Sequence, residues 1–496
     1  MPFKKFIAAI ALLLILALPG CSGEDAGVPP SPQEAAAKDS RALTIKPGCR
    51  SCHPYTLTGT HAELACVSCH NGDNQSGDPQ SAHLDLISRP ADPANMAAKC
   101  GGCHQETAEI ESSRHYTLDN EVNLVRRHFG ATRDLKSLLD IPTTDRPATP
   151  LELADDLLRR RCLRCHVYYE GDDYSQVLHG TGCAACHLEY RDGKPVSHEF
   201  LALPTDDRCL SCHYANRVGG DYYGRFDHDF KLEYRTPYRP EGYYPDRPYA
   251  VEQHRLAPDI HQAAGMTCGD CHFDLHGGKT MQTIACATCH LGRDLPPAAK
   301  HLSIRDGELL VTTRQAGREL PVPRATNPVH AEYIDKAACA VCHAQWSYND
   351  QGTHLLRIDH SEYEEWDDLY IQDSAEVEVL LLNSIYGDEI RDPVMSDKLN
   401  SREKPGLWLK GYNIRRWAEP PIDFARDGRL RVMRPILDLH ISWIDAERKT
   451  LFDSITGETA TLQPYTPHTI GKAGAFYHRR IAKLFPREPN LKDRKP

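Results

Sequence analysis

The sequence predicts a mainly α-helical and irregular fold whose interior is filled partly by something other than side chains, followed by a small β-rich C-terminal domain. Three observations support this fold class. Only 40% of the 496 residues are hydrophobic and the mean hydropathy is −0.53, so a core built from side chains alone would be thin. One cysteine–histidine motif recurs nine times. The motifs stop before the C-terminal residues, where polar and apolar residues alternate instead.

The N-terminal residues have the pattern of an export signal. Lys4 and Lys5 precede a thirteen-residue apolar run over residues 6–18, which is too short to cross a bilayer as a helix. We therefore expect residues 1–20 to be a signal peptide. Cleavage would remove two of the 58 basic residues and none of the 69 acidic ones, so the mature chain has a formal charge of −13. That charge does not favour binding to nucleic acid.

The end of this signal resembles the lipobox of bacterial lipoproteins. It reads Leu-Pro-Gly-Cys21, and Pro19 departs from the usual residue at its position. The resemblance implies lipidation of Cys21 and sorting to the outer membrane, because Ser22 follows the cysteine instead of an aspartate. An ordinary cleaved signal with an incidental cysteine is the alternative. Residues 21–46 are small, polar and proline-rich, and we expect them to be a flexible tether.

The motif Cys-x-x-Cys-His uses eighteen of the nineteen cysteines and leaves only the expected lipid-bearing one. Its cysteines are Cys49, Cys52, Cys66, Cys69, Cys100, Cys103, Cys162, Cys165, Cys183, Cys186, Cys209, Cys212, Cys268, Cys271, Cys286, Cys289, Cys339 and Cys342. Its histidines are His53, His70, His104, His166, His187, His213, His272, His290 and His343.

Three chemistries use cysteines at this density, and they make different demands. Disulfides do not require a histidine after every second cysteine, yet all nine copies have one. Zinc clusters usually join two Cys-x-x-Cys arms without such a histidine. A c-type haem uses every position, because the two thiols add to the vinyl groups of a porphyrin and the histidine reaches its iron. The motif therefore favours nine covalently bound haem c groups.

These motifs resemble those of the multihaem c-type cytochromes that respiring bacteria export. Two segments strengthen the resemblance to the large cytochromes of metal- and sulfur-reducing bacteria: His261-Gln-Ala-Ala-Gly-Met before the seventh motif, and Ala-Gln-Trp346 after the ninth. The resemblance covers roughly residues 49–360. It implies a haem-packed multihaem cytochrome c whose interior is partly porphyrin, and it implies that His261 is a distal iron ligand.

Each haem iron has a second axial position, and histidine is the residue best able to fill it here. The mature chain has five methionines, too few for nine irons, but seventeen histidines outside the motifs. Five motif intervals contain a single such histidine. The candidate distal ligands are His61, His83, His115, His179, His198, His228, His261, His276, His301, His354 and His468.

His276 is expected to serve a haem other than that of its neighbour. It follows His272 by four residues, and on a helix that step returns to the same face. Two axial ligands must approach one iron from opposite faces. His276 and His272 therefore belong to different irons.

The motif spacings predict three units of three haems. Steps between first cysteines are 17, 34 and 62 residues, then 21, 26 and 59, then 18 and 53. The short, medium and long steps recur, which indicates repeated units over residues 47–148, 149–260 and 261–360. Coincidence is the alternative. The second unit opens with a helix signal, since Thr149 has the side chain of an N-cap and Pro150 suits the first helical position.

Residues 361–496 contain no motif and are expected to form a small, haem-free β-rich domain. Alternation in Arg429-Leu-Arg-Val-Met and in Leu437-Asp-Leu-His-Ile-Ser-Trp443, with an Asp-Gly turn before the first, favours strands. His468 lies in this region, either reaching back to a haem or serving as a remnant.

We expect an electron carrier rather than a catalyst, with nine mostly bis-histidine haems. The alternative is a multihaem reductase of a small oxyanion, such as nitrite, tetrathionate or a metal oxyanion, at one haem with an open axial position. The expected location is the outer membrane of a Gram-negative bacterium, facing the periplasm or the cell surface. Expected partners are quinol-linked or periplasmic cytochromes, an outer-membrane porin or an extracellular acceptor.

Overall fold

A computed structural model describes residues 48–485, apart from residues 56, 120, 193, 215–217, 228–248, 250–252, 281, 293–294, 349–350, 363–373, 387–391, 415–416 and 458–460. The expected signal peptide and tether, with Cys21, lie outside the described residues, as does His228. From Gly48 onward the chain forms one compact unit. None of the helices in the described ranges is long and apolar enough to span a bilayer.

The mainly α-helical fold class is wrong, because the structure is 28% helical and 21% strand, with several small sheets. The helices are short, and hairpins occupy much of the chain between the motifs. Two of these hairpins turn at Arg-Asp-Gly segments, where Asp192 and Asp306 have φ angles of 49° and 51°. Asp-Gly favours such tight turns, so the strand signal was present among the motifs as well as after them.

Most of the motifs form a single helical turn of their own. The helices that carry a motif are α1 (Cys49–Cys52), α2 (Cys66–His70), η4 (Cys162–Cys165), α8 (Cys183–His187), α9 (Asp206–His213), α12 (Cys268–Cys271), α13 (Cys286–His290) and α15 (Ala340–His343), and α9 alone among them is longer than about one turn. The third motif lies in a turn directly after α4 (Pro93–Lys99). A single turn places both thiols of a motif on one side, but it contributes little helix to the fold.

The remaining helices are also short, and among the described residues only two of them exceed ten residues. They are η2 (Gly59–His61), α3 (Pro79–Ala82), α5 (Thr107–Ile110), α6 (Val122–His128), η3 (Leu138–Asp140), α7 (Pro150–Arg160), α10 (Gly219–Tyr222), α11 (Ile260–Ala263), η6 (Gly278–Thr280), α14 (Val329–Tyr333), α16 (Ala375–Tyr386) and α17 (Tyr477–Ala482). The Thr149 side chain accepts a hydrogen bond from the Glu152 amide, so α7 begins as its cap predicts.

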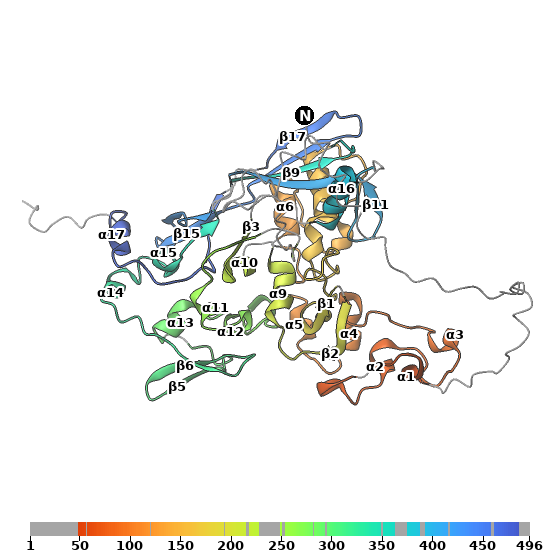
Figure 1. The fold of residues 1–496 in the computed structure, drawn as a ribbon, viewed down its shortest axis with the longest axis horizontal. Helices are drawn as coiled ribbons and strands as arrows, with labels where there is room; N and C mark the ends of the chain where they lie inside the picture. Colours follow the sequence, from red (N-terminus) through yellow and green to blue (C-terminus); the bar gives the residue numbers. More distant parts are fainter. Residues whose placement is uncertain are drawn as a thin grey trace, which may run out of the picture. The chain divides into compact units, whose positions relative to one another are not determined.

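The largest sheet among the described strands has four strands in the order β12-β9-β16-β17 (Figure 1). They are β9 (Gln351–Ile358), β12 (Leu407–Ile414), β16 (Leu439–Ile444) and β17 (Thr450–Ile455). β9 pairs with β12 in antiparallel and with β16 in parallel orientation.

Six smaller sheets accompany it in the described parts of the chain. Their strands are β1 (Leu188–Arg191) with β2 (Lys194–Phe200), β3 (Arg225–Asp227) with β4 (Gln253–Arg255), β5 (Leu302–Arg305) with β6 (Glu308–Thr312) and β7 (Glu319–Pro321), β8 (Ser347–Tyr348) with β13 (Trp417–Ala418), β10 (Val394–Ser396) with β11 (Glu403–Pro405), and β14 (Ile422–Phe424) with β15 (Leu430–Ile436) and β18 (Thr461–Pro464).

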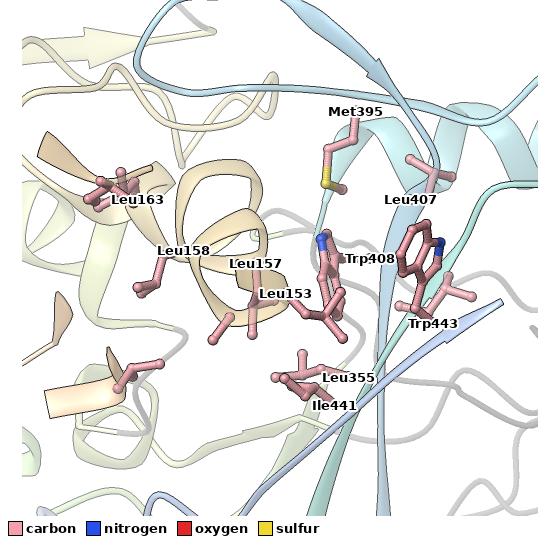
Figure 2. Packing of buried hydrophobic residues seen from close by; sticks show 14 of the residues in the cluster. Leu153, Leu157, Leu158, Leu163, Leu355, Met395, Leu407, Trp408, Ile441 and Trp443 are labelled. Carbon is pink, nitrogen blue, oxygen red and sulfur yellow. The ribbon is translucent and has the colours of Figure 1, made fainter. Parts of the chain in front are cut away.

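The main hydrophobic core is built from side chains, which corrects the expectation of an interior packed by porphyrin. It joins α6, α7 and α16 to the four-stranded sheet. Leu153 and Leu157 of α7 are fully buried and face Trp408 of β12, as Figure 2 shows. We call this cluster the sheet core. The C-terminal strands therefore share their core with helices from the middle of the chain, while the boundaries of the expected trihaem units stay a prediction.

Buried arginines at the end of α7 tie this helix to the sheet. Arg159 makes an ion pair with Asp397 at 2.7 Å, and Arg161 donates to the carbonyl oxygen of Trp408 at 2.6 Å. The Trp408 indole in turn donates to Asp156 at 2.9 Å. The fourth motif begins at Cys162, directly after these arginines, so it is anchored on the sheet core.

Candidate cofactor-binding sites

The nine motifs define nine candidate sites, which we number 1 to 9 in chain order. All eighteen motif cysteines are free thiols, so none of them is joined in a disulfide. One group of three in the described ranges could hold a bare metal ion: Asp206, Cys209 and Cys268, with ligand atoms within 4.8 Å of one another. The Asp206 carboxylate is already occupied, because the Cys268 amide and the Tyr223 hydroxyl donate to it at 2.9 and 2.6 Å. Closed zinc sites need four converging ligands, and nine separate motifs do not provide them.

Eight of the nine motif histidines face a second histidine ring across a narrow range of distances. The centroid distances are 5.9 Å for His53–His83, 6.4 Å for His70–His198, 6.2 Å for His104–His61, 5.6 Å for His187–His276, 6.2 Å for His213–His115, 6.2 Å for His272–His468, 6.0 Å for His290–His261 and 6.2 Å for His343–His330.

This range is the one expected of two imidazoles that share a metal. A metal–imidazole bond is about 2 Å long and the ring centre lies about 1 Å further, so the two centroids lie about 6 Å apart. His354 and His440, neither of which belongs to a motif, stack more closely at 4.8 Å. The spacing therefore distinguishes the motif pairs from this histidine contact elsewhere in the chain.

The pairs cross between motifs that are distant in sequence. His276 faces His187 of site 5 and not the neighbouring His272, whose partner is His468 from near the C-terminus. Seven of the eleven candidate distal ligands lie in such pairs, and the eighth partner is His330, which was not among those candidates. His330 stands nine residues before the ninth motif, and His261 stands seven residues before the seventh motif. This shared position upstream of a motif was the signal that could have identified His330.

Three candidates do not face a motif histidine. His301 uses Nε2 to bond the carbonyl oxygen of Asp270 at 2.8 Å, and His354 directs Nε2 to the amide oxygen of Asn413 at 2.8 Å. Each of these contacts uses the nitrogen that iron would need. His179 lies with Nε2 3.5 Å from Cys212 Sγ, beside site 6 rather than opposite its histidine.

Backbone carbonyls fix the tautomer of several motif histidines. Nδ1 lies 2.8 Å from the carbonyl oxygen of Ile87 in His70, 2.7 Å from that of Pro323 in His290, and 2.9 Å from that of Gly471 in His343. Because a carbonyl oxygen only accepts, Nδ1 must carry the proton and Nε2 must be left with its lone pair. This is the arrangement that orients a histidine for metal binding.

Burial favours the neutral form of five of the paired imidazoles, and metal ligation requires that form. Desolvation lowers the pKa of His187, His272 and His198. It also lowers the pKa of His115 and His468, to which the nearby His272 contributes. A neutral ring keeps the lone pair that a cation would otherwise lose to a proton.

One buried carboxylate positions the distal histidines of two sites. Asp259 Oδ1 accepts from the amide and from Nδ1 of His261, at 2.9 and 2.7 Å. Its Oδ2 accepts from the Ile470 amide at 2.8 Å, which holds the segment carrying His468. Burial acts to raise the pKa of Asp259, but these hydrogen bonds outweigh it and the pKa lies below its usual value. Asp259 thus connects sites 7 and 8.

Site 4 differs from the other eight. The His166 ring is buried, and neither of its nitrogens has a hydrogen-bond partner. Its nearest aromatic contact is Tyr168, two residues along the chain, at 5.1 Å. Burial, with the nearby His115, lowers the pKa of His166 to about 4, so the ring is neutral. Glu121 lies beside the thiols of this site, and its side chain is exposed.

Thiols from different motifs meet and set an order for the sites. The thiol of Cys100 lies near that of Cys183, and the same holds for Cys165 and Cys212, Cys209 and Cys268, and Cys286 and Cys339. Cys69 is also a neighbour of Cys100, Cys186 of Cys209, and Cys271 of Cys289. The resulting order is 2, 3, 5, 6, 7, 8, 9, with site 4 joined to site 6 as a branch.

Site 1 adjoins site 2, the first site of this row, through aromatic side chains. The Tyr55 ring, two residues after His53, lies 4.5 Å from the ring of His198, which is the partner at site 2. All nine sites therefore belong to one connected arrangement. Comparison of the chain with known protein families, curated proteins and solved structures finds no match.

Proposed function

We propose that this protein binds nine haem c groups and transfers electrons along them. The observation that carries the proposal is the set of eight histidine pairs, each joining a motif histidine to a second ring at 5.6–6.4 Å. In this reading, the cysteines of each motif hold one porphyrin covalently and the pair of histidines binds its iron. Bound haem iron exchanges single electrons with a neighbouring haem or redox partner.

The chain's own residues favour transfer over chemistry at the paired sites. Two histidines fill both axial positions of an iron and leave no position for a substrate. The Nδ1 hydrogen bonds of His70, His290 and His343 orient their rings and increase their basicity as ligands. The nearness of thiols from different motifs would hold neighbouring haems close together, and electron tunnelling falls steeply with distance. The row from site 1 to site 9 supports conduction over its length.

The resemblance of the N-terminal segment to a lipoprotein signal supports an outer-membrane location for this carrier, through lipid on Cys21. The acidic balance of the mature chain favours a partner with a basic docking surface. We infer that the partners are other exported redox proteins, with a porin or an extracellular acceptor at the far end.

The test is to produce the chain in a bacterium that attaches haem c and to count the haems. A haemochrome assay and the denatured mass should both give nine covalent haems per chain, and chemical reduction should store nine electrons that an added ferric acceptor withdraws. A colourless protein containing zinc or disulfides would contradict the proposal.

Two variants sharpen this count. The double variant Cys286→Ala, Cys289→Ala should hold eight haems, because it removes the thiols of site 8 alone. The matched control Cys21→Ala should keep nine haems but lose its lipid and its attachment to membranes. A haem count that does not follow the motifs would refute the assignment of one haem to each motif.

A further inference from the structure

The strongest unexplained feature is the unpaired histidine of site 4. In eight sites the motif histidine faces a second imidazole, yet in the described part of the chain none stands at that distance from His166. Both nitrogens of His166 are buried and lack a hydrogen-bond partner. A buried polar group without a partner is costly, so the site is built to bind something at this ring.

The surroundings of site 4 also separate it from the row. Cys162 follows directly on α7, and Leu163 is 1% exposed within the sheet core. Cys165 meets Cys212 of site 6. Site 4 therefore stands at the end of a branch, with a side-chain core on one side and the row of sites on the other. Such a terminal position receives electrons but does not lie on the way to another site.

We propose that the haem of site 4 has His166 as its single histidine ligand and binds a small exogenous molecule at the opposite axial position. This inference rests on the proposed haem content. The ligand class is a small molecule with a lone pair for iron, since the His166 ring lies buried.

Spectroscopy of the holoprotein tests this inference without relying on a turnover assay. EPR of the oxidised protein should show about one high-spin haem and eight low-spin haems per chain. Carbon monoxide added to the reduced protein should bind at about one haem per chain, and cyanide should remove the high-spin signal of the oxidised protein. Nine low-spin haems with no carbon monoxide binding would overturn the proposal while leaving the proposed electron transfer intact. A protein without haem would refute the proposed function instead.

Variants identify the responsible site. His198→Ala removes the partner ring of site 2 and should raise carbon monoxide binding from one to two per chain. The matched control His301→Ala changes a histidine bonded to a carbonyl and should leave it at one. His179→Ala and His228→Ala should also leave the wild-type value of one. If either of these raised it, that histidine would be an axial ligand, and the single open site would have to be reassigned away from His166.

Discussion

Residues 48–90, which we call the motif arm, and the sheet core are held by different means. Between Gly48 and Pro90 no described residue is buried, whereas eight of the eleven residues of α7 are. Large apolar side chains of the arm are exposed, among them Tyr55 at 60% and Leu84 at 69%. A segment without buried side chains cannot offset the entropy of ordering its backbone. If the protein binds the haems that we propose, the arm would depend on them to fold, whereas the sheet core would not.

The largest expected effect follows from removing the cofactors of the arm. A variant with alanine at Cys49, Cys52, Cys66 and Cys69 should lose sites 1 and 2. Amide hydrogens of residues 48–90 should then exchange at rates near those of an unfolded chain, while those of β9 and β12 keep their protection. Hydrogen-exchange mass spectrometry of the variant and the wild type measures both regions at once. If the arm stayed protected, side-chain packing would hold it and the comparison would fail.

The sheet core should respond to the loss of one large side chain. Trp408 is fully buried and its indole donates to Asp156, so Trp408→Ala should cost about 3–5 kcal/mol of unfolding free energy. The haem count and the haem spectrum should stay unchanged. Denaturant titration followed by tryptophan fluorescence provides the measurement.

The control for that variant is Leu139→Ala, because Leu139 is 78% exposed and its loss should change the unfolding free energy by less than about 0.5 kcal/mol. A changed haem spectrum in Trp408→Ala would show that the motif arm and the sheet core are not held separately.

Asp259→Asn should have an intermediate effect, located at sites 7 and 8. The amide cannot accept all of the hydrogen bonds from His261 and Ile470, and a hydrogen bond to a charged group contributes about 2 kcal/mol. The iron bond of His261, of His468 or of both should therefore weaken, and EPR should show an additional high-spin signal. Asp423→Asn, at an exposed carboxylate, is the matched control and should leave the spectrum as it is. An unchanged spectrum in Asp259→Asn would mean that the carboxylate does not position these ligands.

The smallest expected effect is a pH dependence confined to the sheet core. Burial acts to raise the pKa of Glu376, but Lys398, at 2.7 Å, outweighs it and holds the pKa below its ordinary value of 4.5. A lowered pKa stabilises the fold above pH 4.5, and this contribution is lost as the pH falls through the lowered value. Glu376→Gln should therefore cost about 1 kcal/mol near neutral pH and less in acid.

Lys398 determines the high pH at which the ion pair with Glu376 is lost. Burial acts to lower its pKa, but the carboxylates of Asp172 and Glu376 raise it above 10.5, so its contribution is lost only as the pH rises through that raised value. Denaturation of Glu376→Gln and wild type between pH 3 and 9 checks the sign. A difference between them that grows as the pH falls would contradict this assignment.

The sequence predicted local features better than the fold class. Thr149 and Pro150 predicted where α7 begins, and alternation predicted β15 and β16. The hairpins among the motifs were missed, although Arg-Asp-Gly at residues 191–193 and 305–307 repeats the signal used at residues 426–428. The dense cysteines drew the interpretation toward cofactor packing, and the apolar residues that build the sheet core are too far apart in sequence to show a shared core.

For the candidate sites, too, the sequence predicted local features and not the long-range arrangement. Motif spacing identified the nine Cys-x-x-Cys-His units, whose role in haem binding stays a prediction, and helix geometry separated His276 from His272. The pairing itself could not be read from the sequence, because the two rings at site 2 come from residues 70 and 198 and those at site 7 from residues 272 and 468. Such pairings depend on the tertiary fold. The unpaired His166 became visible only when the other eight motif histidines had partners.

The most direct test of the account is an iron-edge anomalous map of the crystallised holoprotein. We predict nine iron positions, eight of them between the paired histidine rings and the ninth at His166 with no histidine opposite. Fewer iron positions, a different pairing of the rings, or a zinc-edge signal at Asp206, Cys209 and Cys268 would contradict it.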